Sequence, residues 1–172
     1  MRVVEGRIHV GEDFPPDVPA FASIEAFVAE LADASTSGTA VQAFDARYVA
    51  GRRHLETAVD HANRSMDRDE NVAEDRAVEI LCYAAGRRQI ERALEMGIGA
   101  GTTPVLVVVD GPDEVSVANR VESVLGPGEA FALSDPDRIA TFFDVTDRER
   151  AATDASLQAL VCERVALLDV EK

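Results

Sequence analysis

The sequence contains no tryptophan, a single lysine and only two cysteines among its 172 residues. Aromatic residues make up 5% of the chain, so its interior must be built mainly from Val, Leu, Ile and Ala. Cys82 and Cys162 belong to no paired motif and lie in apolar helical patterns, which predicts buried, reduced thiols in an intracellular protein. No apolar run approaches the roughly 18 residues of a membrane span, and Met1–Val10 is unlike a signal peptide. We therefore expect a cytoplasmic protein without membrane association.

The charge balance is strongly acidic. The chain has 32 acids against 17 bases, for a formal net charge of -15, and its only lysine is Lys172. An acidic surface almost without lysine is typical of a cytoplasm with very high salt, so we expect a halophilic source. The alternative is acidic drift in an Arg-favouring, Ala-rich genome. Equal stability and solubility in dilute buffer and in molar KCl would exclude salt adaptation.

The hydrophobic pattern predicts an α/β (α+β) fold with one domain over residues 1–172. We expect a small mixed sheet of about four strands, packed with six to seven helices. The expected strands are Arg2–Val10, Thr39–Phe44, a fully buried central Pro104–Asp110, and Glu129–Leu133. The expected helix starts are Ser23, Gly51, a position shortly before Val78, Gly86, Asp113, Asp135 and Asp154. The central helices follow one another without strands, which argues against a doubly wound sheet.

Two Ala-Gly-Arg-Arg segments, Ala50–Arg53 and Ala85–Arg88, lie 35 residues apart and both precede an apolar-periodic helix. The first turn of a helix carries unpaired N–H groups and a partial positive charge, and arginine adds forked donors for phosphate. Each segment therefore predicts a helix start that binds an anion. The alternative is that the glycine only ends the preceding segment and that the arginines are solvated.

The charge distribution favours the anion-binding interpretation. Residues 47–92 hold nine arginines and nine acids, whereas the rest of the chain carries the whole net charge of -15. At molar salt the Debye length is about 3 Å, so binding there requires close contacts such as forked hydrogen bonds or base stacking on arginine or Tyr83. Such a site favours a few exposed nucleotides over a long duplex.

No constellation of residues predicts catalysis, a cofactor or a metal ion. Residues 96–103 resemble a phosphate loop but have the wrong spacing, and they lead from a helix into a strand. His54 and His61 lie about 10 Å apart along one helix, too far to share a metal ion. Cys82 fits core packing better than nucleophilic catalysis. We therefore expect a protein that is not an enzyme, with no small-molecule substrate.

Residues 80–98 carry a family resemblance in an apolar helix followed by a small-small-Gly step, then Gln-Ile, Ala-Leu and Gly-Ile. The segment resembles the kinase-binding regulatory subunit of the KEOPS complex, the family of the PRPK-binding protein and its archaeal counterparts. The resemblance implies an archaeal source. Residues 45–58 resemble an earlier basic helix start of that family, and Glu163–Val170 resembles its ending. The order of elements agrees over nearly the whole chain.

The resemblance implies a non-catalytic subunit that binds and stimulates the small atypical kinase/ATPase of KEOPS. It also implies recruitment of tRNA, by its 3′ CCA end, for threonylcarbamoylation of the adenosine next to the anticodon. The predicted RNA-binding residues are Arg52, Arg53, His54, Gly86, Arg87, Arg88 and Gln89. The predicted kinase-binding residues are Leu160, Val161, Val165, Leu167, Leu168 and Val170, although this stripe also fits core packing. Two alternatives remain: a protein-only regulator of the kinase, and a small α/β enzyme with an unrecognised site.

Overall fold

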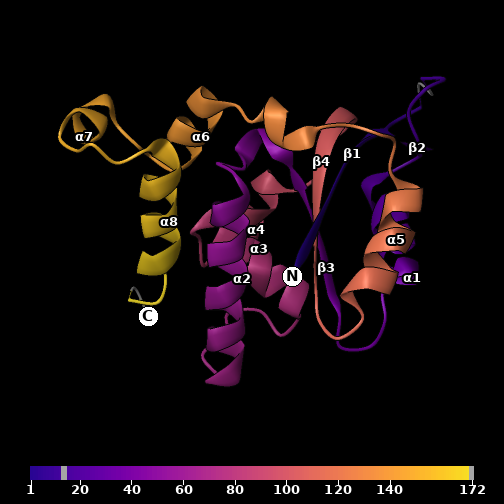
Figure 1. Cartoon of the computed structure of the whole chain (residues 1–172), viewed down its shortest axis with the longest axis horizontal. Helices are drawn as coiled ribbons and strands as arrows, with labels where there is room; N and C mark the ends of the chain where they lie inside the picture. Colours follow the sequence, from indigo (N-terminus) through magenta and orange to yellow (C-terminus); the bar gives the residue numbers. More distant parts are fainter. Residues whose placement is uncertain (13–14, 171–172) are drawn as a thin grey trace. The chain divides into compact units, whose positions relative to one another are not determined.

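The computed structural model describes residues 1–12 and 15–170, and the chain forms two compact units. One unit comprises Met1–Ala46 and Gly97–Leu133, and the other comprises Arg47–Met96 and the chain from Ser134 onward. The first holds β1 (Arg2–Val10), β2 (Ala20–Phe21), α1 (Ile24–Ala34), β3 (Ala40–Asp45), β4 (Gly101–Asp110), α5 (Glu114–Val124) and the 3₁₀ turn η3 (Ala130–Leu133) (Figure 1). The second holds α2 (Arg52–Asp67), α3 (Arg76–Ala85), α4 (Ile90–Ala93), the 3₁₀ turn η2 (Leu94–Met96), α6 (Pro136–Phe142), α7 (Asp147–Ala151) and α8 (Leu157–Leu167); the 3₁₀ turn η1 (Ala46–Tyr48) lies where the units meet in sequence.

The four strands form one mixed sheet in the order β2-β1-β4-β3. β4 pairs antiparallel with both β1 and β3, while the short β2 runs parallel to β1. Val105 to Val109 are all fully buried, which confirms the predicted central strand and explains its uninterrupted apolar run. The mixed α/β fold class is confirmed. As expected, the strand order is not that of a doubly wound sheet.

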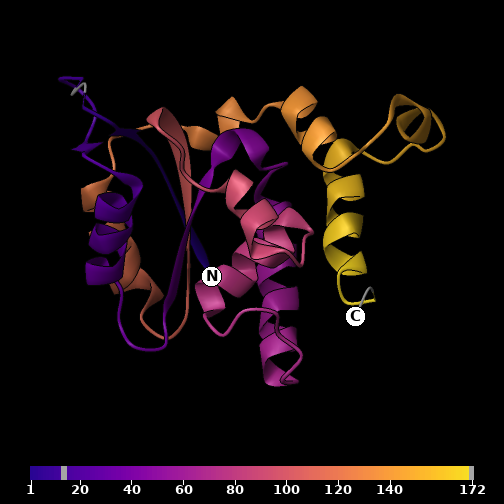
Figure 2. The same ribbon diagram turned by 180° about the vertical axis from the view of Figure 1, so that it is seen from behind.

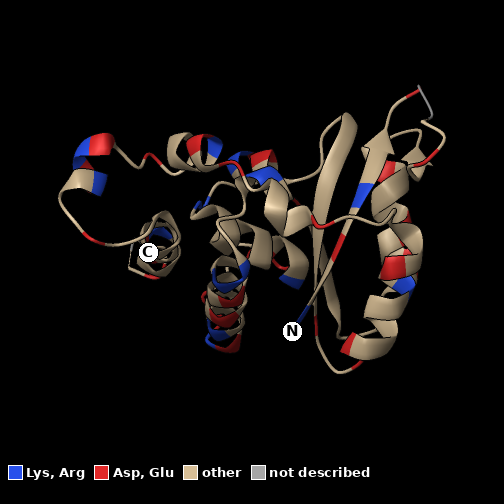
Figure 3. Ribbon diagram, turned by 45° about the horizontal axis from the view of Figure 1, so that its top comes forward, with Lys and Arg blue, Asp and Glu red and all other residues tan. Residues whose placement is uncertain are grey.

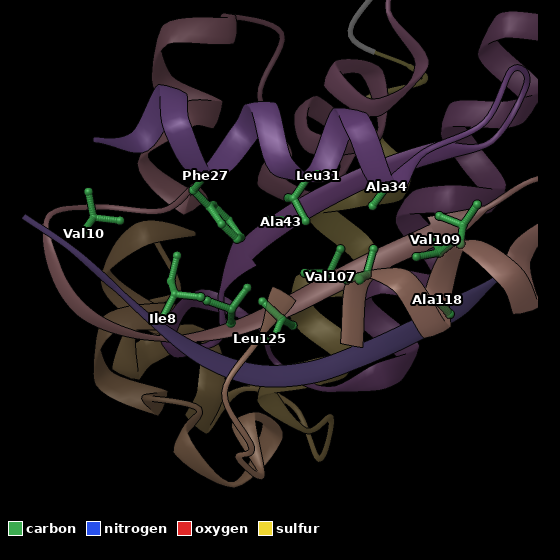
Figure 4. Close-up of a cluster of buried hydrophobic side chains, with 13 residues drawn as sticks. Ile8, Val10, Phe27, Leu31, Ala34, Ala43, Val107, Val109, Ala118 and Leu125 are labelled. Carbon is green, nitrogen blue, oxygen red and sulfur yellow. The ribbon is translucent and has the colours of Figure 1, made fainter. Parts of the chain in front are cut away.

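Both helices of the first unit cover the same face of the sheet, as the two opposite views agree (Figures 1 and 2). Phe27 and Leu31 of α1 point toward the sheet and belong to one cluster with Val107 of β4, Ile8 of β1 and Leu125 after α5 (Figure 4). Removing each such side chain from water contributes about 1.5–3 kcal/mol. This cluster is the hydrophobic core of the unit.

Side-chain hydrogen bonds hold both ends of α1. The Ser23 hydroxyl accepts the Ala26 N–H at 3.2 Å, which confirms the predicted N-cap. At the other end, Arg120 of α5 donates its Nε–H to the Ala34 carbonyl at 2.7 Å. Asp113 precedes α5 as predicted, but its carboxylate accepts the Thr36 hydroxyl rather than capping its own helix.

The second unit is helical, and α2 packs against both α3 and α8. The predicted apolar stripe of α2 is buried at Leu55, Ala58, Val59 and Ala62. Basic and acidic residues both occur along α2 (Figure 3). The start of α6 is also as predicted, with the Asp135 side chain accepting the Arg138 N–H and Pro136 in the first turn.

Several element predictions are wrong. The strand expected at Glu129–Leu133 is absent, because residues 130–133 form η3 and the Phe131 N–H donates to the Glu5 carboxylate rather than to a neighbouring strand. The helix expected up to Gly97 is the four-residue α4 followed by η2. α8 is capped by Ser156, whose hydroxyl accepts the Ala159 N–H, and not by Asp154. α7 has no buried residue, so it lacks the apolar periodicity that would have predicted it.

Candidate functional site

The first Ala-Gly-Arg-Arg segment forms the corner at which α2 begins, as predicted. Gly51 precedes the helix with φ 129° and ψ 177°, a conformation essentially confined to glycine. The Gln158 side-chain amide of α8 donates to the Ala50 carbonyl at 3.0 Å and fills the space beside Gly51 that a Cβ would occupy. Arg52 and Arg53 follow in the first turn, and both side chains are exposed.

His54 ties the start of α2 to the end of α3. Its Nδ1 accepts the Ala50 N–H at 3.2 Å, so the proton lies on Nε2, which donates to the Ala84 carbonyl at 2.7 Å. The ring is fully buried and meets Phe143 edge-on, with 5.5 Å between centroids. Both nitrogens are used inside the protein, so the expectation that His54 lies beside bases is corrected. Its role is to position the corner.

Acid should weaken this joint. Burial lowers the pKa of His54 to about 4, although its hydrogen bond to Ala84 favours the charged ring. Between pH 6.5 and 4 the unfolded chain therefore binds a proton that the folded protein does not. Stability should fall by about 1.4 kcal/mol for each pH unit of acidification across that window.

Urea denaturation at pH 7, 6 and 5 tests this prediction. Because many carboxylates also titrate as the pH falls, the change in the free energy of unfolding per pH unit is compared between wild type and His54→Ala. Equal slopes in the two proteins would contradict the prediction.

The second Ala-Gly-Arg-Arg segment does not begin a helix, and this prediction is wrong. Gly86 ends α3 in the left-handed conformation, with φ 58° and ψ 34°. The Gly86 N–H donates to the Tyr83 carbonyl and the Arg87 N–H donates to the Cys82 carbonyl, the bond pattern of a Schellman motif. The glycine thus satisfies carbonyls at a helix end, which is the alternative considered for this motif. No helical N–H groups point at an anion here.

The residues after Gly86 have different environments. Arg87 donates to the Phe142 carbonyl at 2.7 Å and to Asp144 at 3.0 Å, so its guanidinium holds the end of α6. Arg88 is half-buried, and its Nη1 has no hydrogen-bond partner among the described residues. Gln89 is exposed and precedes α4 without capping it through its side chain. Tyr83 is 1% exposed, so it cannot stack on a base from outside.

α8 lies beside both glycines, and we call the turns at Gly51 and Gly86 the first and second corners. Gln158 contacts Gly51, and Arg164 approaches Gly86, where an added Cβ would lie 3.5 Å from the Arg164 Cβ and carbonyl oxygen. Six residues of helix separate the two contacts by about 9 Å. The His54 bond to Ala84 joins the same two corners directly. Arg52 and Arg53 follow the first of these glycines and Arg88 and Gln89 follow the second, and we call these four residues together the arginine corner.

Most of the C-terminal apolar stripe belongs to the core. Leu160, Val161, Val165 and Leu168 are at most 4% exposed, and α8 packs on α2 and α3. Their prediction as a kinase-binding surface is corrected, because buried side chains do not meet a partner. Leu167 and Val170 are 47% and 76% exposed and remain candidates.

Neither cysteine shows the properties of a catalytic thiol. Cys82 is fully buried, and burial together with the Glu79 carboxylate raises the pKa of its thiol to about 11. Cys162 is half-buried, so the expectation of a fully buried thiol holds only for Cys82. Its sulfur accepts the Thr57 hydroxyl at 3.7 Å.

A hollow of about 450 Å³ lies between α6 and α7, and its charged lining consists of Asp137, Asp144, Asp147 and Arg150. Three carboxylates against one arginine disfavour an anion there. Across residues 1–12 and 15–170, no group of three His, Cys, Asp or Glu side chains could hold a metal ion. None of the helices in this part of the chain is long and apolar enough to cross a membrane.

The first turn of α2 thus exposes Arg52 and Arg53, while His54 is buried and bonded to the end of α3. The chain matches the family described as kinase binding protein CGI-121 over residues 23–169, and it belongs to this family. The match begins at the N-cap of α1 and ends at Asp169, so β1 and β2 lie outside it. No curated protein matches the chain. Family membership establishes a kinase-binding class, and it favours a non-catalytic regulator.

Proposed function

We propose that this protein is the non-catalytic KEOPS subunit that binds and stimulates the small atypical kinase/ATPase and recruits tRNA. The tRNA would be held by its 3′ CCA end while the adenosine next to the anticodon is threonylcarbamoylated. The observation that carries the proposal is the family match over residues 23–169, a family of kinase-binding proteins. The predicted resemblance to the KEOPS subunit agrees with that match.

The arginine corner supports the RNA part of the proposal. Arg52 and Arg53 are exposed in the first turn of α2, and the exposed Gln89 carries both donors and an acceptor for a base edge. The corner lies in the electrically neutral stretch of a chain with net charge -15, where repulsion of phosphate is weakest. Arg87 contributes indirectly, since its bonds to Phe142 and Asp144 fix the second corner.

We further propose an archaeal, salt-adapted source, because carboxylates dominate the surface and only one lysine is present. In molar salt, long-range attraction between arginine and phosphate is screened within about 3 Å. A short single-stranded end, clamped by forked hydrogen bonds, suits that condition better than a duplex.

The test is charge reversal at the arginine corner. The double variant Arg52→Glu/Arg53→Glu should bind tRNA at least tenfold more weakly, because each lost charge-assisted hydrogen bond costs about 1.5–3 kcal/mol. Fluorescence anisotropy with labelled tRNA, at low salt and in molar KCl, measures the effect. tRNA lacking its CCA end should bind wild type as weakly as intact tRNA binds the variant.

Arg64→Glu/Arg68→Glu is the matched control, since it makes the same charge change at the far end of the same helix. These side chains are exposed, and they should affect tRNA binding much less than the first pair. An equal loss in both double variants would reduce the effect to general electrostatics. Full binding by Arg52→Glu/Arg53→Glu would exclude the arginine corner as the tRNA site.

A protein-only regulator of the kinase is the second candidate. It is favoured by Arg87, whose guanidinium is engaged within the protein, and by Gly86, which ends a helix instead of beginning one. In that case purified protein would retain the kinase subunit but show no saturable binding of tRNA. The exposed Leu167 and Val170 are the proposed kinase contacts in either case.

A further inference from the structure

Buried and exposed side chains lie next to each other in the turn that follows α8. After the helix, the N–H groups of Leu168, Asp169 and Val170 donate three residues back, so the last turn continues tightly. Leu168 is 3% exposed and faces inward, whereas Leu167 and Val170 face solvent. Leu167 and Val170 lie three residues apart, which places them on one side of this turn.

Asp169 ties this turn to two other helices. One carboxylate oxygen lies 2.7 Å from Nδ1 of His61 on α2, and the other accepts the Tyr83 hydroxyl of α3 at 2.5 Å. The His61 and Tyr83 rings stack with centroids 5.9 Å apart and an interplanar angle of 28°. A single carboxylate thus closes a three-helix contact, which we call the Asp169 latch.

The latch is partly shielded from water, which strengthens it. The side chains of His61 and Asp169 are 14% and 28% exposed, and Tyr83 is almost fully buried. Burial, followed by the bond to Asp169, raises the pKa of Tyr83 to about 12, so the phenol stays a donor at neutral pH. Loss of the carboxylate would leave a buried hydroxyl without this partner.

We infer that Asp169 is a positioning residue, whose latch to His61 and Tyr83 holds the end of α8 so that Leu167 and Val170 are presented to the kinase. The inference rests on the proposed kinase-binding function. The occupant is the kinase, because the chain belongs to a family of kinase-binding proteins and Leu167 and Val170 are exposed apolar side chains beside the latch. Asp169 itself does not contact the kinase; it positions Leu167 and Val170, which do.

The experiment compares Asp169→Ala and Tyr83→Phe with Glu163→Ala, which removes an exposed acid from the same helix. Amide hydrogen exchange on the full chain reads the latch, and affinity for the purified kinase subunit reads its consequence. In Asp169→Ala, amides 166–170 should exchange at least tenfold faster while α2 and α3 keep their protection. Kinase affinity should fall at least tenfold, with tRNA affinity unchanged.

Tyr83→Phe removes one of the two latch bonds and should give intermediate values in both measurements, while Glu163→Ala should match wild type. Unchanged exchange in Asp169→Ala overturns the latch. Faster exchange with unchanged kinase affinity, or a change only in self-association, overturns its role in docking. If Asp169→Ala loses kinase and tRNA affinity in parallel, Asp169 only stabilises the fold, and its specific role in kinase binding is overturned. Failure of wild type to bind the kinase overturns the proposed function together with the docking role, whereas the exchange result still judges the latch.

Discussion

Replacing His54 by alanine should lower the free energy of unfolding by about 4 kcal/mol. The substitution removes a fully buried ring and leaves the Ala84 carbonyl and the Ala50 N–H without their partner. Each unsatisfied buried group costs about 1–3 kcal/mol, and the cavity beside Phe143 adds to the loss. Urea denaturation at pH 7, with the slope of the transition compared between variants, measures the effect.

His9→Ala serves as the control for this prediction. His9 is only half-buried, and its ring makes an exposed side-chain hydrogen bond to Thr102, so its removal should cost about 1 kcal/mol or less. Similar costs for the two histidine variants would show that the His54 bonds contribute little to stability.

Gly51→Ala should be far more damaging than Gly86→Ala, although both glycines belong to the same Ala-Gly-Arg-Arg motif. At Gly51 the backbone is confined to glycine, and a Cβ would lie 2.1 Å from the Gln158 amide nitrogen, so that this side chain must move aside and release the Ala50 carbonyl. We expect a cost of about 3–4 kcal/mol. At Gly86 the left-handed conformation alone costs about 1–2 kcal/mol, because a Cβ there would meet only ordinary contacts at 3.5 Å.

Thermal and urea denaturation of the two variants measure the difference. Gly51→Ala/Gln158→Ala separates the two causes at the first corner, since it removes the clash but keeps the unfavourable backbone angles. The double variant should therefore recover only part of the lost stability. Equal costs at the two glycines would mean that the two corners are alike in solution.

The sequence predicted best where one physical signal dominated. The apolar run of β4 and the capping signals at Ser23 and Asp135 needed no tertiary information, and all three were confirmed. The repeated glycine–arginine motif is ambiguous because glycine occurs before helices as well as, more often, after them. Only the hydrogen bonds of residues 86 and 87 back into α3 distinguish these roles.

Only part of the candidate site could be predicted, because the local sequence around its exposed residues does not differ from that around its buried ones. Arg53 and Arg88 occupy the same place in the two Ala-Gly-Arg-Arg segments, yet Arg53 is exposed whereas Arg88 is half-buried. The family resemblance implies that His54 binds RNA, whereas the apolar residues Leu55 and Ala58 beside it indicate a buried face of the helix. Gln158 and Asp169 were missed because their partners lie about 100 residues away.

The His54 joint has an electrostatic consequence for the arginine corner. It brings the first turn of α2, where a helix carries partial positive charge, against the last turn of α3, where a helix carries partial negative charge. The two end charges oppose each other, so the peptide backbone offers an anion little net attraction at this point. Selectivity for phosphate then rests on the guanidinium groups themselves, whose planar fork and permanent charge a lysine would not reproduce.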